Sequence, residues 1–416
     1  MWFCEYAVMT NINQSIPDLS AERVRIPPFA FVLTTCIGVI GSNSLALGPI
    51  APEVALRLGA DVPAVMTASG AFGLGTAASA IFLGRLIDRH GPRRMLAAAL
   101  MLLAAGLGGS AAAPALPLLV AFQLIVGIAA GIALPSIYTL ASIIAPTGRE
   151  SETIGLVLTG WTLSMVAGVP LSAAIADFAG WRTVYIVVAT ATLLACVAVR
   201  FAAVTEDSRG GQVGGGRATS PIAALGVRGV APLLSACAAF MAAFYGVYAY
   251  IGDHLHAALG LPVSANGLVA VSYGFGFGGA AFLDRLIDRF GAGRLLPLIF
   301  LAVAGVYVAM AAASGSYVAI LAVVFLWGLA NHFGLNVLIM RLTALDPARR
   351  GAIMGLNSGV TYLALFAGTI GFGAAYAGSG FFILPLAAAV LMFVAALFAA
   401  RAPRSNSAMS PLIVAD

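Results

Sequence analysis

Long apolar runs separated by short polar segments dominate this chain. A helix that spans a membrane needs about 20 mainly apolar residues, and runs of that length recur twelve times. They are too long and too uniform for the alternating strands of a barrel, so they predict helices. The predicted spans are residues 29–51, 63–84, 94–113, 117–140, 153–176, 182–201, 229–252, 264–283, 294–313, 316–340, 351–373 and 379–400.

One polar, glycine-rich stretch, residues 205–221, separates the sixth span from the seventh. Such a composition is typical of a flexible linker. The sequence therefore predicts an all-α membrane protein with twelve transmembrane helices in two six-helix bundles. Its expected parts are an N-terminal tail (1–28), a first bundle (29–204), the linker (205–221), a second bundle (222–401) and a C-terminal tail (402–416).

A charged loop motif occurs once in each predicted half. Arg85 to Arg89 reads RLIDR and returns as Arg285 to Arg289, with Gly91 matched by Gly291. A repeat at this distance indicates two copies of one large unit, and hence pseudo-symmetric halves. In membrane proteins, paired halves place a binding site between them.

Composition supports the bilayer as the solvent for this chain. Of its 416 residues, 61% are hydrophobic and 9% are charged, whereas soluble domains carry roughly 25% charged residues. The net charge of +5 comes from 21 arginines without any lysine. The arginines lie in short loops between spans rather than on one basic face, which excludes nucleic acid as a partner.

The distribution of arginines predicts the orientation. Nineteen of the 21 lie on one side of the predicted spans, and Arg57 and Arg182 lie on the other. Because cytoplasmic loops are enriched in basic residues, we expect a multi-pass protein of the cell (inner) membrane with both termini in the cytoplasm.

The loop and fifth-span motifs resemble those of a known family. The loop reads Gly84-x-Leu86-x-Asp88-Arg89-x-Gly91-x-Arg93-Arg94, and the fifth span combines Gly160, Gly168-Val169-Pro170 and Gly180-Trp181-Arg182. The first resembles the cytoplasmic loop signature of the major facilitator superfamily. The second is similar to the drug–proton antiporter branch, including its bacterial sugar- and purine-efflux members. The resemblance implies a twelve-helix secondary transporter that exports solute.

Three positions depart from the family pattern. Pro92 replaces a basic residue of the loop motif, and Asp284 stands where the first copy has Gly84. In the fourth span Gln123 occupies the position of the family's arginine, four residues before Gly127. Where that arginine takes part in proton coupling, this chain lacks it.

The loop motif contains residues suited to gating. A carboxylate at Asp88 can meet the positive N-terminus of a helix or an arginine; the resemblance implies that this helix is the eleventh span. The alternative is that the motif only retains basic residues inside the cell. The predicted gating set is Gly84, Asp88, Arg89, Gly91, Arg93 and Arg94, with Asp288 and Arg289 as a weaker second latch. Gly160, Gly168 and Pro170 are expected to bend or pack the fifth helix.

Few ionisable or polar residues lie deep in the predicted spans. His332 is a candidate for proton coupling because ionisable groups in membranes are costly and histidine titrates near neutral pH; alternatively it is a neutral residue bonded to another helix. Tyr245 and Tyr248 share a helix face and predict an aromatic wall or an interfacial belt. The amides that line a cavity or link helices are Asn43, Gln123, Asn331, Asn336 and Asn357.

Together these features predict a secondary active transporter that works by alternating access. No arginine lies well inside a span, which favours a neutral or weakly polar small organic solute over an anion, and proton-linked export is the first hypothesis. Open alternatives are an importer or facilitative uniporter of the same fold, or a transporter-like sensor without flux. An enzyme would need paired acids or a nucleophile–base set, which His332 alone does not supply.

The cysteines (Cys4, Cys36, Cys196 and Cys237) form no CxxC pair, so we expect no disulfide, metal or cofactor. We expect a functional monomer.

Overall fold

The computed structural model describes residues 26–146, 149–202, 224–280, 283 and 292–403. In these residues all regular elements are helices, and eleven of them are long and apolar enough to cross a membrane. The remaining predicted span is represented by α11 (Ala265–Ala280), of which sixteen residues are described. The predicted linker lies outside the described residues, as do most of the two tails.

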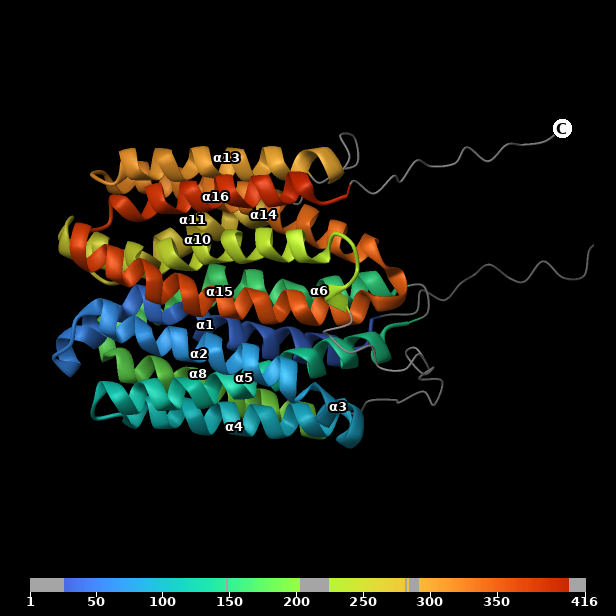
Figure 1. Cartoon of the computed structure of the whole chain (residues 1–416). Coiled ribbons are helices and arrows are strands. Elements are labelled where there is room, and N and C mark those ends of the chain that lie inside the picture. Colours follow the sequence, from blue (N-terminus) through green and yellow to red (C-terminus); the bar gives the residue numbers. More distant parts are fainter. Residues whose placement is uncertain (1–25, 147–148, 203–223, 281–282, 284–291, 404–416) are drawn as a thin grey trace, which may run out of the picture.

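Figure 1 shows the helices running roughly parallel, with the N-terminal half below and the C-terminal half above. The first half contains α1 (Phe29–Leu58), α2 (Val62–Phe82), α3 (Gly84–His90), α4 (Pro92–Ala112), α5 (Leu116–Ile144), α6 (Glu150–Leu163), the π-helix η1 (Ser164–Gly168), α7 (Val169–Ala179) and α8 (Trp181–Phe201). The second contains α10 (Val230–Ala257), α11, α13 (Ala292–Ala313), α14 (Tyr317–Leu345), the 3₁₀ turn η3 (Pro347–Arg349), α15 (Arg350–Ser379) and α16 (Ile383–Arg401).

Several helices extend beyond their predicted spans. α1 continues to Leu58, seven residues past its predicted end, and α14 and α15 each continue for about one turn or more. Hydropathy marks the apolar stretch, whereas backbone hydrogen bonding continues through the polar turns that follow it. The short helix α3 was not predicted because a seven-residue charged segment carries no apolar run. α4 begins with Pro92 directly after Gly91, whose φ of +83° suits glycine.

Glycines bring two helices of each half into backbone contact. A Cβ atom added to Gly127 on α5 would lie 2.1 Å from the carbonyl oxygen of Phe72 on α2, and one added to Gly328 on α14 would lie 2.2 Å from that of Tyr273 on α11. The members of each pair match across the halves at a spacing of 201 residues. Small residues permit such close approach in lipid, so the repeat seen in the loops continues into the helix packing.

An arginine side chain caps the C-terminal carbonyls of the last helix in each half. In the first half Arg93 donates to the carbonyl oxygens of Val199, Arg200 and Ala202, at 2.6–3.2 Å, at the end of α8. In the second half Arg341 donates to Ala399, Ala402 and Pro403, at 2.9–3.2 Å, at the end of α16. Terminal carbonyls lack partners in their own helix and carry the negative end of its dipole, so both arginines satisfy them.

Candidate functional site at the interface between the halves

Among the described residues the two halves meet mainly along three pairs of elements: α2 with α15, α1 with α10, and the fifth helix (α6, η1 and α7) with α11; α2 also touches α10. Contact between α2 and α15 is close: a Cβ atom added to Gly73 would lie 2.8 Å from the carbonyl oxygen of Tyr362, and the Phe72 and Tyr362 rings meet edge to face with centroids 6.2 Å apart. The predicted solute-binding side chains lie on and beside these helices.

Prolines in α1 create a polar contact with the other half. Pro49 has no N–H group, so the carbonyl of Leu45 loses its usual donor four residues later. The hydroxyl of Tyr248 on α10 donates to this carbonyl oxygen at 3.2 Å. Tyr248, predicted as part of an aromatic wall, therefore also replaces a missing backbone hydrogen bond across the interface.

A second proline repeats this effect one turn later. Pro52 removes the donor for the carbonyl of Gly48, and Gly252 on α10 approaches that oxygen so closely that an added Cβ atom would lie 2.9 Å away. On α11, the Asn266 side-chain amide donates to the Pro49 carbonyl oxygen at 3.0 Å. Neighbouring helices thus cover the proline-containing turn of α1.

Another bond between the halves lies at the end of the molecule opposite the arginine-rich loops. The backbone N–H of Ser264 donates to Oδ2 of Asp177, on α7, at 2.7 Å. Ser264 directly precedes α11, so the carboxylate lies at the positive N-terminus of that helix. The same helices touch where Gly267 packs on Pro170, with an added Cβ atom 3.2 Å from the proline Cα.

In the first half, three buried polar side chains form a hydrogen-bonded chain, which we call the amide chain. The Asn43 amide on α1 donates to Oε1 of Gln123 on α5 at 3.3 Å, and the Gln123 amide donates to the hydroxyl of Ser110 on α4 at 3.1 Å. Asn43 and Gln123, predicted separately, are therefore brought together. Among the described residues, Oδ1 of Asn43 has no hydrogen-bond partner.

In the second half, the corresponding depth is filled by rings. The aromatic cluster consists of Phe244, Tyr245, Tyr248, Tyr273 and Trp327, and the centroid of Phe244 lies 5.0–5.7 Å from those of the other four. The amide of Asn331 donates to the Tyr273 hydroxyl at 3.1 Å. Within the described part of the chain, Oδ1 of Asn331 accepts no hydrogen bond.

The remaining predicted residues of α14 and α15 lie nearby but do not join this cluster. The ring of His332 meets that of Phe277 edge to face at 5.0 Å and that of Phe333 at 5.8 Å. His332 and Asn336 are partly buried. Asn357 is buried on α15, and its Oδ1 has no partner among the described residues. Their roles in coupling and binding stay predictions.

Sequence reasoning missed three aromatic residues at the interface. Tyr362 on α15 meets Phe72 on α2 edge to face across the interface, and Tyr138 on α5 lies close enough to Tyr362 for their hydroxyls to interact electrostatically. These residues come from both halves. An aromatic residue inside a span gave no signal of whether it faces lipid or the partner half.

The structure places only part of the predicted gating set. Gly91 ends α3 with a positive φ, Arg93 closes α8 within its own half, and Arg89 and Arg94 are exposed. Gly84 and Asp88 belong to α3, but the Asp88 side chain lies outside the described part of the structure. Asp288 and Arg289 also lie outside the described residues.

The fifth helix changes its hydrogen-bonding pattern between the predicted bending residues. The π-helix η1 occupies Ser164–Gly168, between Gly160 and Pro170. An added Cβ atom would lie 2.4 Å from the Thr34 carbonyl at Gly160 and 2.0 Å from the Ser42 hydroxyl at Gly168. The segment therefore combines close packing on α1 with a local irregularity of the kind that often marks functional regions.

Comparison with known proteins agrees with this architecture. The family model described as Major Facilitator Superfamily matches residues 32–369. The chain belongs to the major facilitator superfamily. An uncharacterized MFS-type transporter, YwfA of Bacillus subtilis, is 28% identical over 94% of this chain and 96% of its own length. The chloramphenicol resistance protein of Streptomyces lividans is 26% identical over 82% of this chain and 88% of its own.

Solved structures of superfamily transporters share the fold. A bacterial homolog of the human lysosomal transporter Spinster, inward-facing and unoccupied, has a TM-score of 0.74 at 17% identity and covers 89% of this chain and 95% of its own. The D-xylose–proton symporter has a TM-score of 0.73 at 16% identity, covering 91% and 98%. Family and fold together identify a multi-pass membrane transporter with two six-helix halves, rather than an enzyme.

Proposed function

We propose that this superfamily member is a secondary active transporter that exports neutral or weakly polar small organic solutes, linked to protons, by alternating access. Its arginine-rich end and both termini would face the cytoplasm of the cell inner membrane. The observation that carries the proposal is the chemistry at mid-depth, which consists of amides, hydroxyls and aromatic rings. In the described residues the one buried charged side chain is Arg341, which closes α16.

The relatives support the direction and the coupling in different ways. One is named for chloramphenicol resistance, which favours export of an organic solute by this chain. The D-xylose–proton symporter shares the fold alone, and it supports only the general point that a transporter of this fold can couple solute movement to protons. Uptake, facilitated diffusion and sensing without flux are therefore outcomes that the experiments below must separate.

The contacts between the halves suit a reversible closure. Away from the arginine-rich end, three hydrogen bonds that involve a side chain join the halves in the described residues: Tyr248 to Leu45, Asn266 to Pro49 and Ser264 to Asp177. A net hydrogen bond contributes about 0.5–1.5 kcal/mol, so three contribute only a few kcal/mol. A ligand that binds the open form about 5.5 kcal/mol more tightly than the closed form reverses a 1:99 ratio of open to closed protein. The few kcal/mol held in these bonds is smaller, so differential binding of solute and protons is sufficient to break them.

The first test is a ligand screen on the purified protein. Ligands that bind the native state raise its thermal stability, and we expect neutral aromatic or amphipathic compounds to do so and small organic anions not to. Selective stabilisation by anions would contradict the proposed solute class.

The second test measures coupling in proteoliposomes that contain a pH-sensitive dye. When a compound from the screen is added on one side of the membrane, protons should cross in the direction opposite to the compound. His332→Gln should remove the pH dependence of transport while keeping the thermal shift, because an amide can bond but cannot titrate near neutral pH. Solute flux without proton movement would instead identify a facilitator, and unchanged pH dependence in His332→Gln would exclude that residue from coupling.

A further inference from the structure

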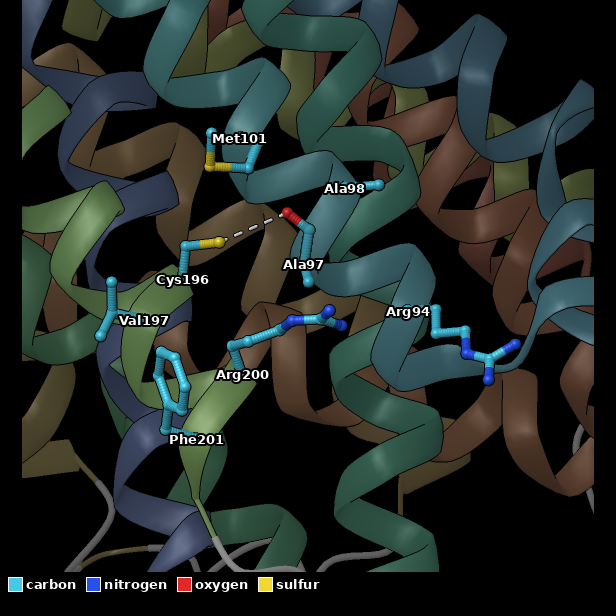
Figure 2. Close-up of a pocket in the computed structure, with 8 residues that line it drawn as sticks. All are labelled: Arg94, Ala97, Ala98, Met101, Cys196, Val197, Arg200 and Phe201. Atoms are coloured by element: carbon cyan, nitrogen blue, oxygen red, sulfur yellow. Dashed lines mark hydrogen bonds between the residues drawn. The ribbon is translucent and has the colours of Figure 1, made fainter.

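A groove on the outer surface of the first half has no part in the proposed transport site. It lies between α4 and α8, at their arginine-rich ends, and has a volume of about 420 Å³. Figure 2 shows the side chains that line it: Arg94, Ala97, Ala98, Met101, Cys196, Val197, Arg200 and Phe201.

The walls of this groove are apolar and face outward. Met101 is 54% exposed, Val197 53% and Phe201 80%. Both helices are candidate membrane spans, so these side chains contact lipid. Within the groove the Cys196 thiol donates to the Ala97 carbonyl oxygen at 3.5 Å, a bond that links α8 to α4.

The end of the groove carries two exposed arginines. In the part of the chain that the structure describes, neither Arg94 nor Arg200 pairs with a carboxylate. The carbonyls at the end of α8 accept from Arg93 and carry no net charge, so they do not neutralise these two arginines. In Figure 2 the Arg200 side chain extends toward α4, and that of Arg94 points away from it. A smaller adjoining pocket of about 240 Å³ is lined by all three arginines.

We propose that this groove binds one anionic phospholipid. The phosphate would be held by Arg200 and by Arg94, which lines the same groove and would have to turn its guanidinium toward Arg200. An acyl chain would lie along Ala98, Met101 and Val197. A guanidinium offers paired N–H donors that match phosphate oxygens, and basic pockets between helices near the membrane surface suit anionic headgroups. A lipid fits better than a free anion because most of the lining is apolar and opens to the bilayer.

The bound lipid would link α4 and α8. These helices pack together on the flank of the first half, away from the interface with the second half. Lipid occupancy is therefore a property separate from transport, and it can be measured without knowing the solute. Arg94 also belongs to the predicted gating set, but retained lipid is measured directly, so the lipid proposal can fail while the export function holds, and the reverse.

Native mass spectrometry of the full chain in detergent tests the proposal. Wild-type protein mixed with phosphatidylglycerol should retain one lipid, whereas phosphatidylcholine should be retained far less. The Arg94→Gln/Arg200→Gln variant should lower the retained phosphatidylglycerol by about tenfold or more, the scale expected for two cationic contacts near the surface. Equal retention of the two lipids, or unchanged retention in this variant, would overturn the proposal.

Two further variants separate the groove from general surface charge. Arg401 is an exposed arginine at the end of α16, the counterpart of α8, so Arg401→Gln is the matched control and should keep the lipid. Ala98→Trp keeps both cations but fills the groove, and it should lose the lipid. Loss in Arg401→Gln equal to that in the double variant, or full retention in Ala98→Trp, would count against the site.

A last arm uses glycerol phosphate, which has the charge without the acyl chains. It should not displace phosphatidylglycerol at equal concentration. Complete displacement would show that the site selects a free phosphate, and the lipid proposal would then be wrong. Each variant is first checked for a single symmetric peak in size-exclusion chromatography, so that lost binding is not mistaken for lost folding.

Discussion

The two halves use the same contacts between helices but differ in what they place at mid-depth. Gly127 on α5 and Gly328 on α14 both approach a carbonyl of the neighbouring helix. At the same 201-residue spacing, however, Trp327 corresponds to Val126, and Asn331 corresponds to Ala130. The first half therefore presents the amide chain, and the second half presents the aromatic cluster.

The difference shows that the repeat preserves packing rather than solute chemistry. Backbone contacts between helices tolerate almost no substitution, so both copies keep glycine there. Side chains at the interface are free to diverge, because each half faces a different side of whatever lies between them. We expect a solute to meet amide oxygens on one side and ring faces on the other, the mixture of apolar walls and a few placed polar groups typical of small-molecule sites.

The shared scaffold predicts the largest effect. Gly127→Val and Gly328→Val should each abolish most of the folded protein, because a backbone carbonyl cannot rotate away from the new side chain. The cost should exceed the roughly 1–3 kcal/mol typical of overpacking. The measurement is the yield of monodisperse protein in detergent and its melting temperature.

Matched controls exist in both halves. Gly108 and Gly305 have no heavy atom within 4 Å of an added Cβ and lie on exposed faces. Gly108→Val and Gly305→Val should therefore fold nearly as well as the wild type. If Gly127→Val and Gly328→Val differed greatly, the scaffold would not be shared as described.

Substitutions in the aromatic cluster and in the amide chain should lower stability by an intermediate amount, and by more in the aromatic cluster. Trp327→Ala removes a fully buried ring from the aromatic cluster and should lower stability by about 3–5 kcal/mol. Gln123→Leu removes the acceptor of the Asn43 amide and the donor to the Ser110 hydroxyl, which keeps its own bond to the Gly106 carbonyl, and it should cost about 1–3 kcal/mol. Comparing the melting temperatures of these two variants tests the order; a larger loss in Gln123→Leu would reverse the comparison.

The smallest effect is expected where the aromatic cluster touches the first half. Tyr248→Phe removes the bond to the Leu45 carbonyl and should weaken closure by about 1 kcal/mol. The measurement uses a variant whose native cysteines are replaced and which carries Ala249→Cys as a probe. Ala249 is 1% exposed, so a membrane-impermeant maleimide should label this cysteine faster when closure is weakened. Tyr245→Phe is the control, since its hydroxyl makes no described bond to α1. Equal labelling in both variants would mean that the Tyr248 hydroxyl does not hold the helices together.

The fold was largely predictable because hydropathy and the loop repeat are properties of the sequence. Twelve apolar runs and two copies of RLIDR led to the two-half architecture, and the loop motif led to the family. The end of α1 was not predicted, since a helix continues past its apolar stretch when its hydrogen bonds do.

The site was less predictable because it depends on which helix faces meet. Asn43 and Gln123 were candidates, but their mutual bond requires α1 and α5 to be neighbours. Tyr138 and Tyr362 gave no signal, since an aromatic ring in a span serves equally well against lipid. The bond from Tyr248 to Leu45 had a detectable cause in Pro49, which leaves a carbonyl without a donor, yet the donor that replaces it comes from the other half.

That proline-containing turn of α1 has a consequence for any route through the protein. If α10 withdraws, the oxygens of Leu45 and Gly48 find no replacement within their own helix, and hydrocarbon cannot provide one. Water must then enter at this level before a solute can pass. The turn therefore makes hydration part of opening, so that the passage becomes wet as soon as the two helices separate.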